Sequence, residues 1–165
     1  MATTRLLAID PGNAQSAYCL IDVETRKPIC FDKLPNDMLR KVLYDHAIDA
    51  QEVVIEMVAS YGMPVGKTVF ETCVWIGRFM EAVIGWSDQT GLVYRHDVKM
   101  AICHNNSAKD SNIVQALIDR FDPEATNHGK GTKTHPGWFY GFRADIWQAY
   151  ALAVTAVDNG LILNW

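Results

Sequence analysis

The sequence lacks most of the short patterns by which metal, redox and nucleotide sites are recognised. Its four cysteines include no CxxC pair, so neither a zinc site nor a thiol redox centre is indicated, and we expect buried free thiols. The histidines form no HExxH or HxxxH pattern, and we interpret them as ordinary loop or surface residues. Residues 62–68 have the wrong spacing for a GxxxxGKT phosphate loop.

Long hydrophobic runs are also absent near the start of the chain. The apolar run at residues 6–9 is too short for a signal peptide or a membrane span. With 165 residues, of which 49% are hydrophobic, the chain is long enough to bury one core. We therefore expect one domain over residues 1–165, without internal repeats and located in the cytoplasm, which would be that of a bacterial host if a phage encodes the chain.

The charge is unevenly distributed. A net charge of −4 argues at first against a nucleic-acid partner. Acids outnumber bases between residues 22 and 56, whereas residues 128–143 contain Lys130, Lys133, Arg143 and two histidines but no acid. An acidic total can therefore conceal a basic lobe, and clustered carboxylates lose their negative charge to a bound metal.

The order of apolar patterns predicts a mixed α/β domain. Three short strands, at residues 6–9, 17–23 and 28–33, predict an antiparallel meander. The expected later elements are a helix at 36–48, a strand at 53–56, a helix at 68–84, a strand at 92–95, a helix at 111–121 and a helix at 142–159. Residues 60–66 and 122–141 are expected to be loops. In the helix at 68–84, the apolar stripe is expected at Val69, Cys73, Ile76, Met80 and Val83.

Carboxylates close two of the strand-like runs. Residues 6–9 end in Asp10-Pro11-Gly12-Asn13, where a tight turn leaves Asp10 at an edge that substrate can reach. The run 53–55 ends in the same way in Glu56. Two acids from separate strand ends can share one divalent cation. A third acid, Asp145, lies in the first turn expected for the last helix. Taken singly, these residues are equally a turn former, a surface acid and a helix-cap residue.

Together these segments resemble a known family. The resemblance rests on Leu7 to Asn13 with Ser16-Ala17-Tyr18, Val54-Ile55-Glu56 with Gly77-Arg78, Tyr94 to Lys99, Asn106 to Lys109, and Asp145 to Ala153. In this order they are similar to RuvC-type Holliday junction resolvases of the RNase H-like superfold. Residues 61–67 and 70–79 look most like bacteriophage members. The resemblance implies a mixed five-stranded sheet with helices on both faces.

The resemblance also implies a mechanism. It assigns catalysis to Asp10, Glu56, Asp145 and Gln148, with two Mg²⁺ ions for which Mn²⁺ substitutes. Asp10 would bridge both ions, Glu56 would bind one and Asp145 the other. The family commonly has a fourth acid where this chain has Gln148. An amide oxygen coordinates a metal weakly or holds a metal-bound water, and it brings no negative charge.

The resemblance further implies binding to four-way DNA junctions by a homodimer that makes paired symmetric nicks. Candidate contacts to DNA are Tyr61, Met63, Lys67, Arg78, Lys99, Lys109, Lys130, Lys133, His135 and Arg143. Lys99, His135 and Arg143 are the candidates for stabilising the cleaved phosphate. The aromatic and apolar loop tip at Tyr61 and Met63 is suited to wedge between bases. For the dimer interface we expect the helix at 68–84, through Phe70, Val74, Trp75 and Ile76.

Three other functions stay open. An RNA-processing nuclease of the YqgF type would share the acids but cut another substrate. An actin-like or sugar-kinase ATPase begins with a similar acidic turn, although 165 residues leave no room for its second domain. A junction-binding protein that has lost catalysis would be consistent with Gln148 in place of an acid.

Overall fold

The computed structural model describes residues 3–160 of the chain. The ends of the predicted domain range, residues 1–2 and 161–165, lie outside this part. The elements in chain order are β1 (Arg5–Asp10), β2 (Gln15–Asp22), β3 (Pro28–Pro35), α1 (Asn36–Tyr44), β4 (Glu52–Met57), α2 (Lys67–Val83), β5 (Gln89–Tyr94), α3 (Arg95–Cys103), α4 (Asp110–Phe121) and α5 (Ile146–Asn159). None of the helices in the described part is long and apolar enough to span a membrane.

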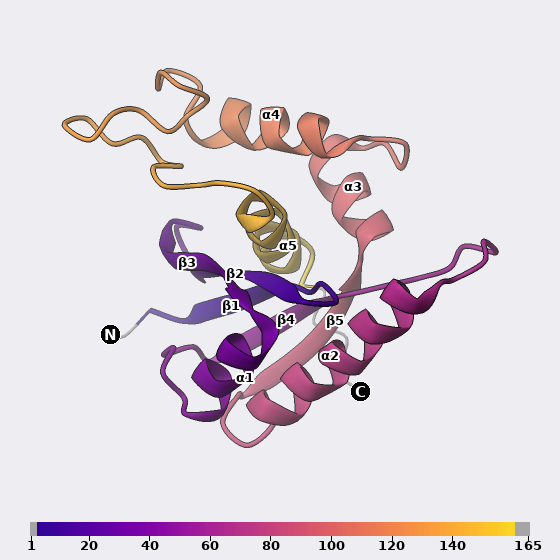
Figure 1. Ribbon diagram of the computed structural model, residues 1–165. Helices are drawn as coiled ribbons and strands as arrows, with labels where there is room; N and C mark the ends of the chain where they lie inside the picture. Colours follow the sequence, from indigo (N-terminus) through magenta and orange to yellow (C-terminus); the bar gives the residue numbers. More distant parts are fainter. Residues whose placement is uncertain (1–2, 161–165) are drawn as a thin grey trace.

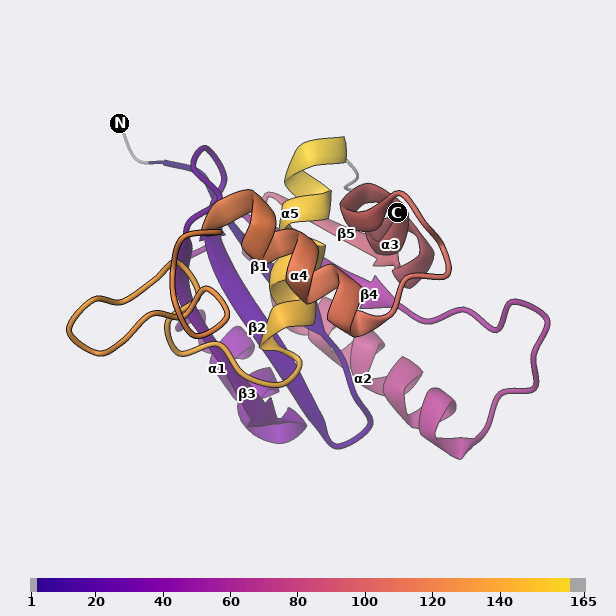
Figure 2. The ribbon, with the colours of Figure 1, turned by 90° about the horizontal axis from the view of Figure 1, so that it is seen from above.

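The sheet confirms the predicted α/β architecture. Its five strands follow the order β3-β2-β1-β4-β5. The first three form an antiparallel meander, and β4 and β5 are added in parallel to β1. Helices α1 and α2 cover one face and α5 covers the other, with α3 beside it and α4 lying across its outer side (Figures 1 and 2). This is the mixed five-stranded sheet with helices on both faces that the resemblance implies.

Strand alternation decides which layer each strand-end acid faces. In β1, Leu7 and Ile9 pack in the core under α1 and α2, whereas Leu6 and Ala8 pack in the core under α5. Successive side chains of a strand point to opposite faces, so Asp10 continues the row of Leu6 and Ala8. By the same rule, Glu56 continues the row of Val54 on β4. Both carboxylates therefore belong to the face that α5 covers.

The segment before α5 is loop, as predicted, but it is tightly packed. The indole Nε1 of Trp138 donates to the Tyr150 hydroxyl at 2.9 Å, which in turn donates to the Arg26 carbonyl at 2.9 Å. Phe139 and Phe142 are buried against Tyr150, with ring centroids 5.5 Å from it in both cases. These contacts anchor the first turns of α5 and so set the position of the residues at its N-terminus.

Two predicted helices differ from the observed ones, and one observed helix was not predicted. The first ends at Tyr44 rather than near residue 48, because His46 has a φ of +50° and the chain turns there. The last begins at Ile146 rather than 142, because Ala144 has a φ of +46°. Asp145 is therefore the residue before the helix, not part of its first turn. The segment after β5, for which no helix is predicted, contains α3 (Arg95–Cys103), in which Val98 is the only residue buried.

Smaller corrections concern burial. The stripe that α2 buries runs through Thr72, Ile76, Phe79 and Val83 with Ala82, which leaves the predicted Val69, Cys73 and Met80 only half-buried beside it. The four cysteines are free, but only Cys19 is fully buried, and Cys30, Cys73 and Cys103 are half-buried.

Candidate functional site

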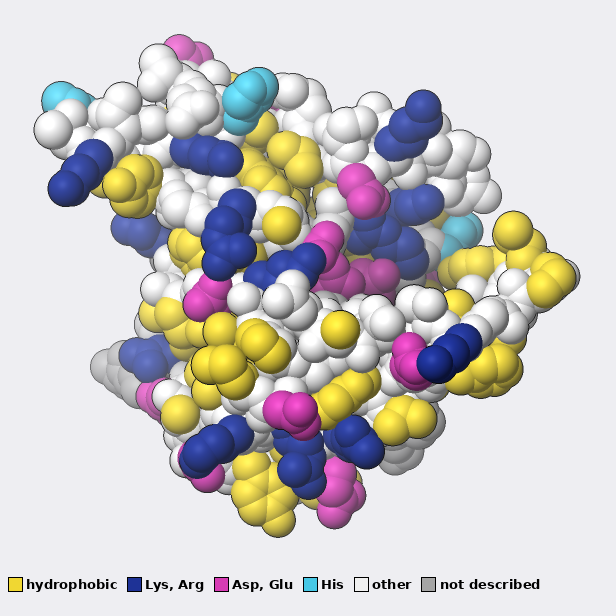
Figure 3. Space-filling model, in the orientation of Figure 1, with side chains coloured by type: hydrophobic (Ala, Val, Ile, Leu, Met, Phe, Trp, Pro, Cys, Tyr) yellow, Lys and Arg dark blue, Asp and Glu magenta, His cyan; other side chains and the backbone are white. Residues whose placement is uncertain are grey.

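The three predicted acids meet where the strand ends face the beginning of α5. Asp10 closes β1, Glu56 lies near the end of β4, and Asp145 directly precedes α5. Asp10 experiences the charges of both Glu56 and Asp145, which places the three carboxylates in one electrostatic group. Figure 3 shows acidic side chains in a hollow at the centre of this face, with Lys and Arg side chains around them.

The turn after Asp10 is rigidly held. The backbone N–H of Gly12 donates to the Ser16 hydroxyl at 3.1 Å, and that hydroxyl donates to Asn36 Oδ1 at 2.6 Å. The Asn36 amide returns to the Gly12 carbonyl at 2.8 Å. A Cβ at residue 12 would lie 2.3 Å from the Gln15 carbonyl oxygen, so only glycine fits. This network fixes the backbone at the point where Asp10 leaves the sheet.

Burial and like charge make two of the carboxylates, those of Asp10 and Glu56, reluctant to ionise. Burial, followed by the charges of Glu56 and Asp145, raises the pKa of Asp10 well above its ordinary value of 3.8. Burial is also the largest influence on Glu56, whose pKa rises to about 7 although Arg95 and Lys99 lower it. Perturbed acids of this kind are typical of functional sites, since an ordinary fold gains nothing from burying like charges together.

Two basic side chains, Lys33 and Arg95, form ion pairs with the acids. The sequence patterns assign a role to neither of them. Lys33 Nζ, from β3, lies 2.5 Å from Asp145 Oδ2. Arg95, the first residue of α3, lies 3.7 Å from Glu56 Oε2 through Nη1, and through Nη2 it pairs with Asp110 at the start of α4. Lys33 is distant from Asp145 in the sequence, and Arg95 is separated from Glu56 by a helix and a strand, so only the folded chain brings these pairs together.

Asp110 is the further acid that the sequence analysis missed. Its charge raises the pKa of both Asp10 and Glu56, so it belongs to the same electrostatic group. The only signal in the sequence was its position directly after Lys109 in the segment 106–109 that resembles the family.

Gln148 lies in the first turns of α5, three residues after Asp145. Its side chain is only 6% exposed. Within residues 3–160, Gln148 Oε1 and Glu56 Oε2 are buried oxygen atoms that have no hydrogen-bond partner. Unpartnered buried oxygens are costly, and a cation is one group that satisfies them.

The oxygen atoms that these residues offer are of the kinds that a hard divalent cation binds. They comprise carboxylate oxygens from Asp10, Glu56 and Asp145 and an amide oxygen from Gln148, which are the ligand types that Mg²⁺ and Mn²⁺ take. Within the described residues, however, no three His, Cys, Asp or Glu side chains are placed closely enough to hold a metal together. Instead, Lys33 pairs with Asp145 and Arg95 pairs with Glu56. Metal binding therefore requires these two basic side chains to move.

Most of the predicted DNA-contacting bases either pair with other side chains or are exposed. Lys67 pairs with Glu71 at 3.5 Å, and the Arg78 guanidinium lies 4.6 Å from the centre of the Trp75 ring. Lys109 is exposed just before α4, and Lys133 and His135 are exposed in the loop before α5, where Lys130 is half-buried. Arg143 pairs with Asp32 at 2.7 Å.

Lys99 is the predicted base that lies at the acids. It lowers the pKa of Glu56 and lines a cavity with Arg95. Tyr61 lines the same cavity, and its ring centroid is 6.5 Å from that of His96. Met63, farther along the same loop, is 72% exposed. The two loop residues that the sequence analysis grouped together therefore have different surroundings.

Comparisons with known proteins give a structural likeness only. No protein-family model and no curated protein sequence matches the chain. Thermus thermophilus RuvC in complex with a Holliday junction substrate superposes with a TM-score of 0.70 at 11% identity, over 95% of this chain and 94% of that one. A second structure of Thermus thermophilus RuvC gives a TM-score of 0.64 at 14% identity, over 95% and 97%. The chain therefore has a RuvC-like fold.

Proposed function

We propose that the protein is a metal-dependent endonuclease that cuts branched DNA, with four-way junctions as its main substrate. The observation that carries this proposal is the group of buried, incompletely neutralised carboxylates at the strand ends of a RuvC-like fold. The fold alone is compatible with several functions, whereas acids held together at raised pKa are suited to binding a divalent cation.

Asp10, Glu56 and Asp145 would hold Mg²⁺ or Mn²⁺, and the charges of both other acids act on Asp10. When bound, two such ions supply an activated water and neutralise the charge that develops on the phosphate. The carbonyl of Gln148 would complete the oxygen ligands as a neutral donor.

Asp110 offers the negative charge that Gln148 lacks. Arg95 pairs with both Asp110 and Glu56, and the charge of Asp110 acts on both Glu56 and Asp10. We infer that Asp110 contributes to the total charge that attracts the metal ions, so that the fourth acid has a different position in this chain than in the family it resembles.

The remaining polar residues of the site position the DNA. Among the three candidates for stabilising the cleaved phosphate, Lys99 is supported by its proximity to Glu56. Arg143 is already paired with Asp32, and His135 lies in the exposed loop before α5, so we assign both to contacts with the DNA backbone. Lys33 and Arg95 keep Asp145 and Glu56 oriented and partly neutralised until metal and DNA arrive.

Symmetric cutting of two strands calls for a homodimer, and the outer face of α2 supports one. Phe70 and Val74 are 60% and 53% exposed there, whereas Ile76, also expected at this interface, is buried in the monomer. Adjacent exposed apolar side chains on one helix are typical of a contact surface.

A junction-binding protein with weakened catalysis is the second candidate, and the neutral Gln148 favours it. An RNA nuclease of the YqgF type is the third. Incubation of the wild type and Asp10→Asn with a synthetic four-way junction, linear duplex, single-stranded DNA and RNA, in Mg²⁺ or Mn²⁺, separates them. We expect junction cleavage by the wild type alone. Binding without cleavage would favour the second candidate, and equal cutting of duplex or RNA would contradict junction selectivity.

A further inference from the structure

Lys33 and Asp10 lie in one row of residues that crosses three strands of the sheet. Asp10 of β1 is directly opposite Ala17 of β2, and Ala17 is directly opposite Lys33 of β3. Opposed residues of neighbouring strands share a face of the sheet. Because Ala17 packs in the core under α5, Lys33 belongs to the face that carries Asp10, two strand spacings or roughly 10 Å away from it.

The Lys33 side chain extends along this face to Asp145. Its Nζ lies 2.5 Å from Asp145 Oδ2, and the side chain is 25% exposed. Between Lys33 and Asp10 the row contains only the methyl group of Ala17, so no large side chain of β2 stands between the two residues. The charge of Asp145 acts on Asp10. A DNA phosphate that reaches these acids therefore also reaches the Lys33 ammonium.

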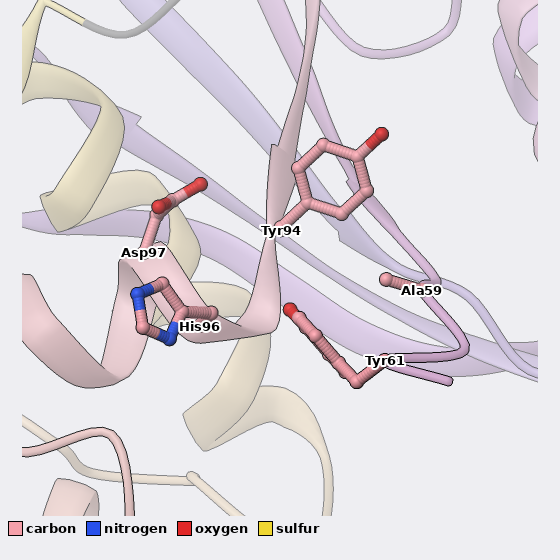
Figure 4. A pocket seen from close by; sticks show the side chains of 5 residues that line it. All are labelled: Ala59, Tyr61, Tyr94, His96 and Asp97. Atoms are coloured by element: carbon pink, nitrogen blue, oxygen red, sulfur yellow. The ribbon is translucent and has the colours of Figure 1, made fainter. Parts of the chain in front are cut away.

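The two cations that pair with the acids come from opposite edges of the sheet. Lys33 belongs to the edge strand β3, and Arg95 directly follows the other edge strand, β5. Figure 4 shows the surroundings on the second side, where Tyr94 and His96, at the junction of β5 and α3, border a cavity of about 310 Å³. The acids of the inner strands β1 and β4 therefore have a cation available from each side.

The two cations differ in how many acids hold them. Arg95 pairs with Glu56 and also with Asp110, so the loss of one partner leaves it fixed by the other. Among the acids of residues 3–160, Lys33 pairs with Asp145 alone. When the Asp145 carboxylate binds a divalent cation, the Lys33 ammonium loses its counterion, and a partly buried ammonium without a counterion is costly. Lys33 is therefore the cation that becomes available to another anion.

We propose that Lys33 binds two anions in turn: the Asp145 carboxylate in the free protein, and a DNA phosphate once Asp145 binds a divalent cation. This exchange rests on the proposed function, which supplies both the cation and the DNA. Phosphate oxygens accept strong, charge-assisted hydrogen bonds from an ammonium. Because the carboxylate and the phosphate compete for one ammonium, the release of Asp145 and the binding of DNA favour each other. Lys33 thus couples metal binding to DNA binding.

A double-mutant cycle without divalent metal tests the exchange. Binding of a four-way junction in EDTA is measured over a range of salt concentrations for the wild type, Lys33→Met, Asp145→Asn and the double variant. Asp145→Asn releases Lys33 without any metal, and asparagine suits the position before a helix, so the fold is preserved.

We expect the factor by which Lys33→Met weakens junction binding to be at least roughly 5-fold larger in the Asp145→Asn background than in the wild type. In Asp145→Asn the salt dependence should steepen by about one released counterion, and the double variant should lose this gain. Lys33→Arg keeps the positive charge and should bind the junction as Lys33 does in both backgrounds.

Asp32→Asn is the matched control. Asp32 directly precedes Lys33 in β3 and pairs with Arg143, so this variant removes the same charge nearby but leaves the pair of Lys33 with Asp145 intact. The effects of Asp32→Asn and Lys33→Met on junction binding should therefore be additive. If Lys33→Met weakens binding by the same factor in the wild type and in Asp145→Asn, Lys33 does not exchange its partner and the proposal is wrong.

Calorimetry with Mn²⁺ alone separates this proposal from the proposed function. Lys33→Met should bind Mn²⁺ roughly 5-fold or more tightly than the wild type, because no ammonium has to leave Asp145. Tighter Mn²⁺ binding by this variant supports the exchange even if the wild type cuts no junction. Unchanged or weaker Mn²⁺ binding by Lys33→Met, beside a wild type that cuts junctions, overturns the exchange and leaves the nuclease intact.

Discussion

At the two ends of α5, the surroundings shift the pKa of an acidic residue in opposite directions. At its beginning, Asp145 faces Asp10, and burial with like charge raises the pKa of Asp10. Near its end, burial also acts to raise the pKa of Asp158, but hydrogen bonds from Arg120 and Arg26 outweigh it and leave that pKa below its ordinary value. The two ends thus differ in whether basic groups fully compensate the acids.

The difference distinguishes an acid that stabilises the fold from acids that do not. An acid at a helix C-terminus is disfavoured by the helix dipole, and the two arginines offset this at Asp158. At the other end, Lys33 and Arg95 compensate only part of the charge, and Glu56 Oε2 and Gln148 Oε1 stay without hydrogen-bond partners within the described residues. Compensation indicates a structural role, and the incomplete compensation at the other end is what the proposed cation site requires.

The largest expected effect separates the two ends by activity. Asp10→Asn should reduce junction cleavage at least about 100-fold, because it removes a carboxylate that we propose as a metal ligand. It should leave the thermal midpoint of the metal-free protein unchanged or higher, because it removes a repelling charge. Asp158→Asn should cut at nearly the wild-type rate. Comparable losses of cleavage in both variants would contradict the distinction between the two ends.

The pH dependence of stability gives the next effect. The pKa of Glu56 is about 7 in the folded protein, against an ordinary value of 4.5. Folding therefore favours the protonated form, and this stabilisation is complete below pH 4.5 and is lost as the pH rises through 7.

Urea unfolding in EDTA measures this effect in the wild type and in Glu56→Gln. The advantage of Glu56→Gln over the wild type should grow by roughly 1–3 kcal/mol between pH 5 and pH 8. Parallel stability curves for the two proteins would mean that Glu56 titrates normally.

Removing the acid at residue 110, and then adding one at residue 148, should change the affinity for metal by an intermediate amount. Asp110→Asn should weaken Mn²⁺ binding by about 10-fold, measured by calorimetry without DNA. Gln148→Glu, which restores an acid at the family's usual position, should recover the affinity in the Asp110→Asn background. If Asp110→Asn leaves Mn²⁺ affinity unchanged, Asp110 is only a surface partner of Arg95.

The smallest expected effect concerns the compensated end of α5. Asp158→Asn should destabilise the protein by about 1 kcal/mol at pH 7, after allowance for the partial exposure of the pairs. The pKa of Asp158 is lowered, so its contribution exists above the ordinary value of 3.8 and is lost as the pH falls below it. The variant and the wild type should therefore converge in acid, as measured by chemical unfolding at both pH values.

Local patterns predicted the elements whose burial is regular. The apolar runs in β1 and β4 located the strands that end in Asp10 and near Glu56, and both are confirmed. Helix α3 was missed because Val98 is its only buried residue, which leaves no periodic apolar pattern to recognise. The late start of α5 was missed because the positive φ of Ala144 has no glycine signal.

The sequence by itself determined that acids stand at two strand ends and near the beginning of the last helix, because strand and helix periodicities are short-range and follow from the side chains in order. Only the tertiary structure decided what surrounds them. Lys33 of the edge strand β3 pairs with Asp145. Arg95 at the start of α3 pairs with both Glu56 of β4 and Asp110 at the start of α4. Burial and charge act through space rather than along the chain, so the raised pKa values of Asp10 and Glu56 depend on the assembled sheet and its covering helix.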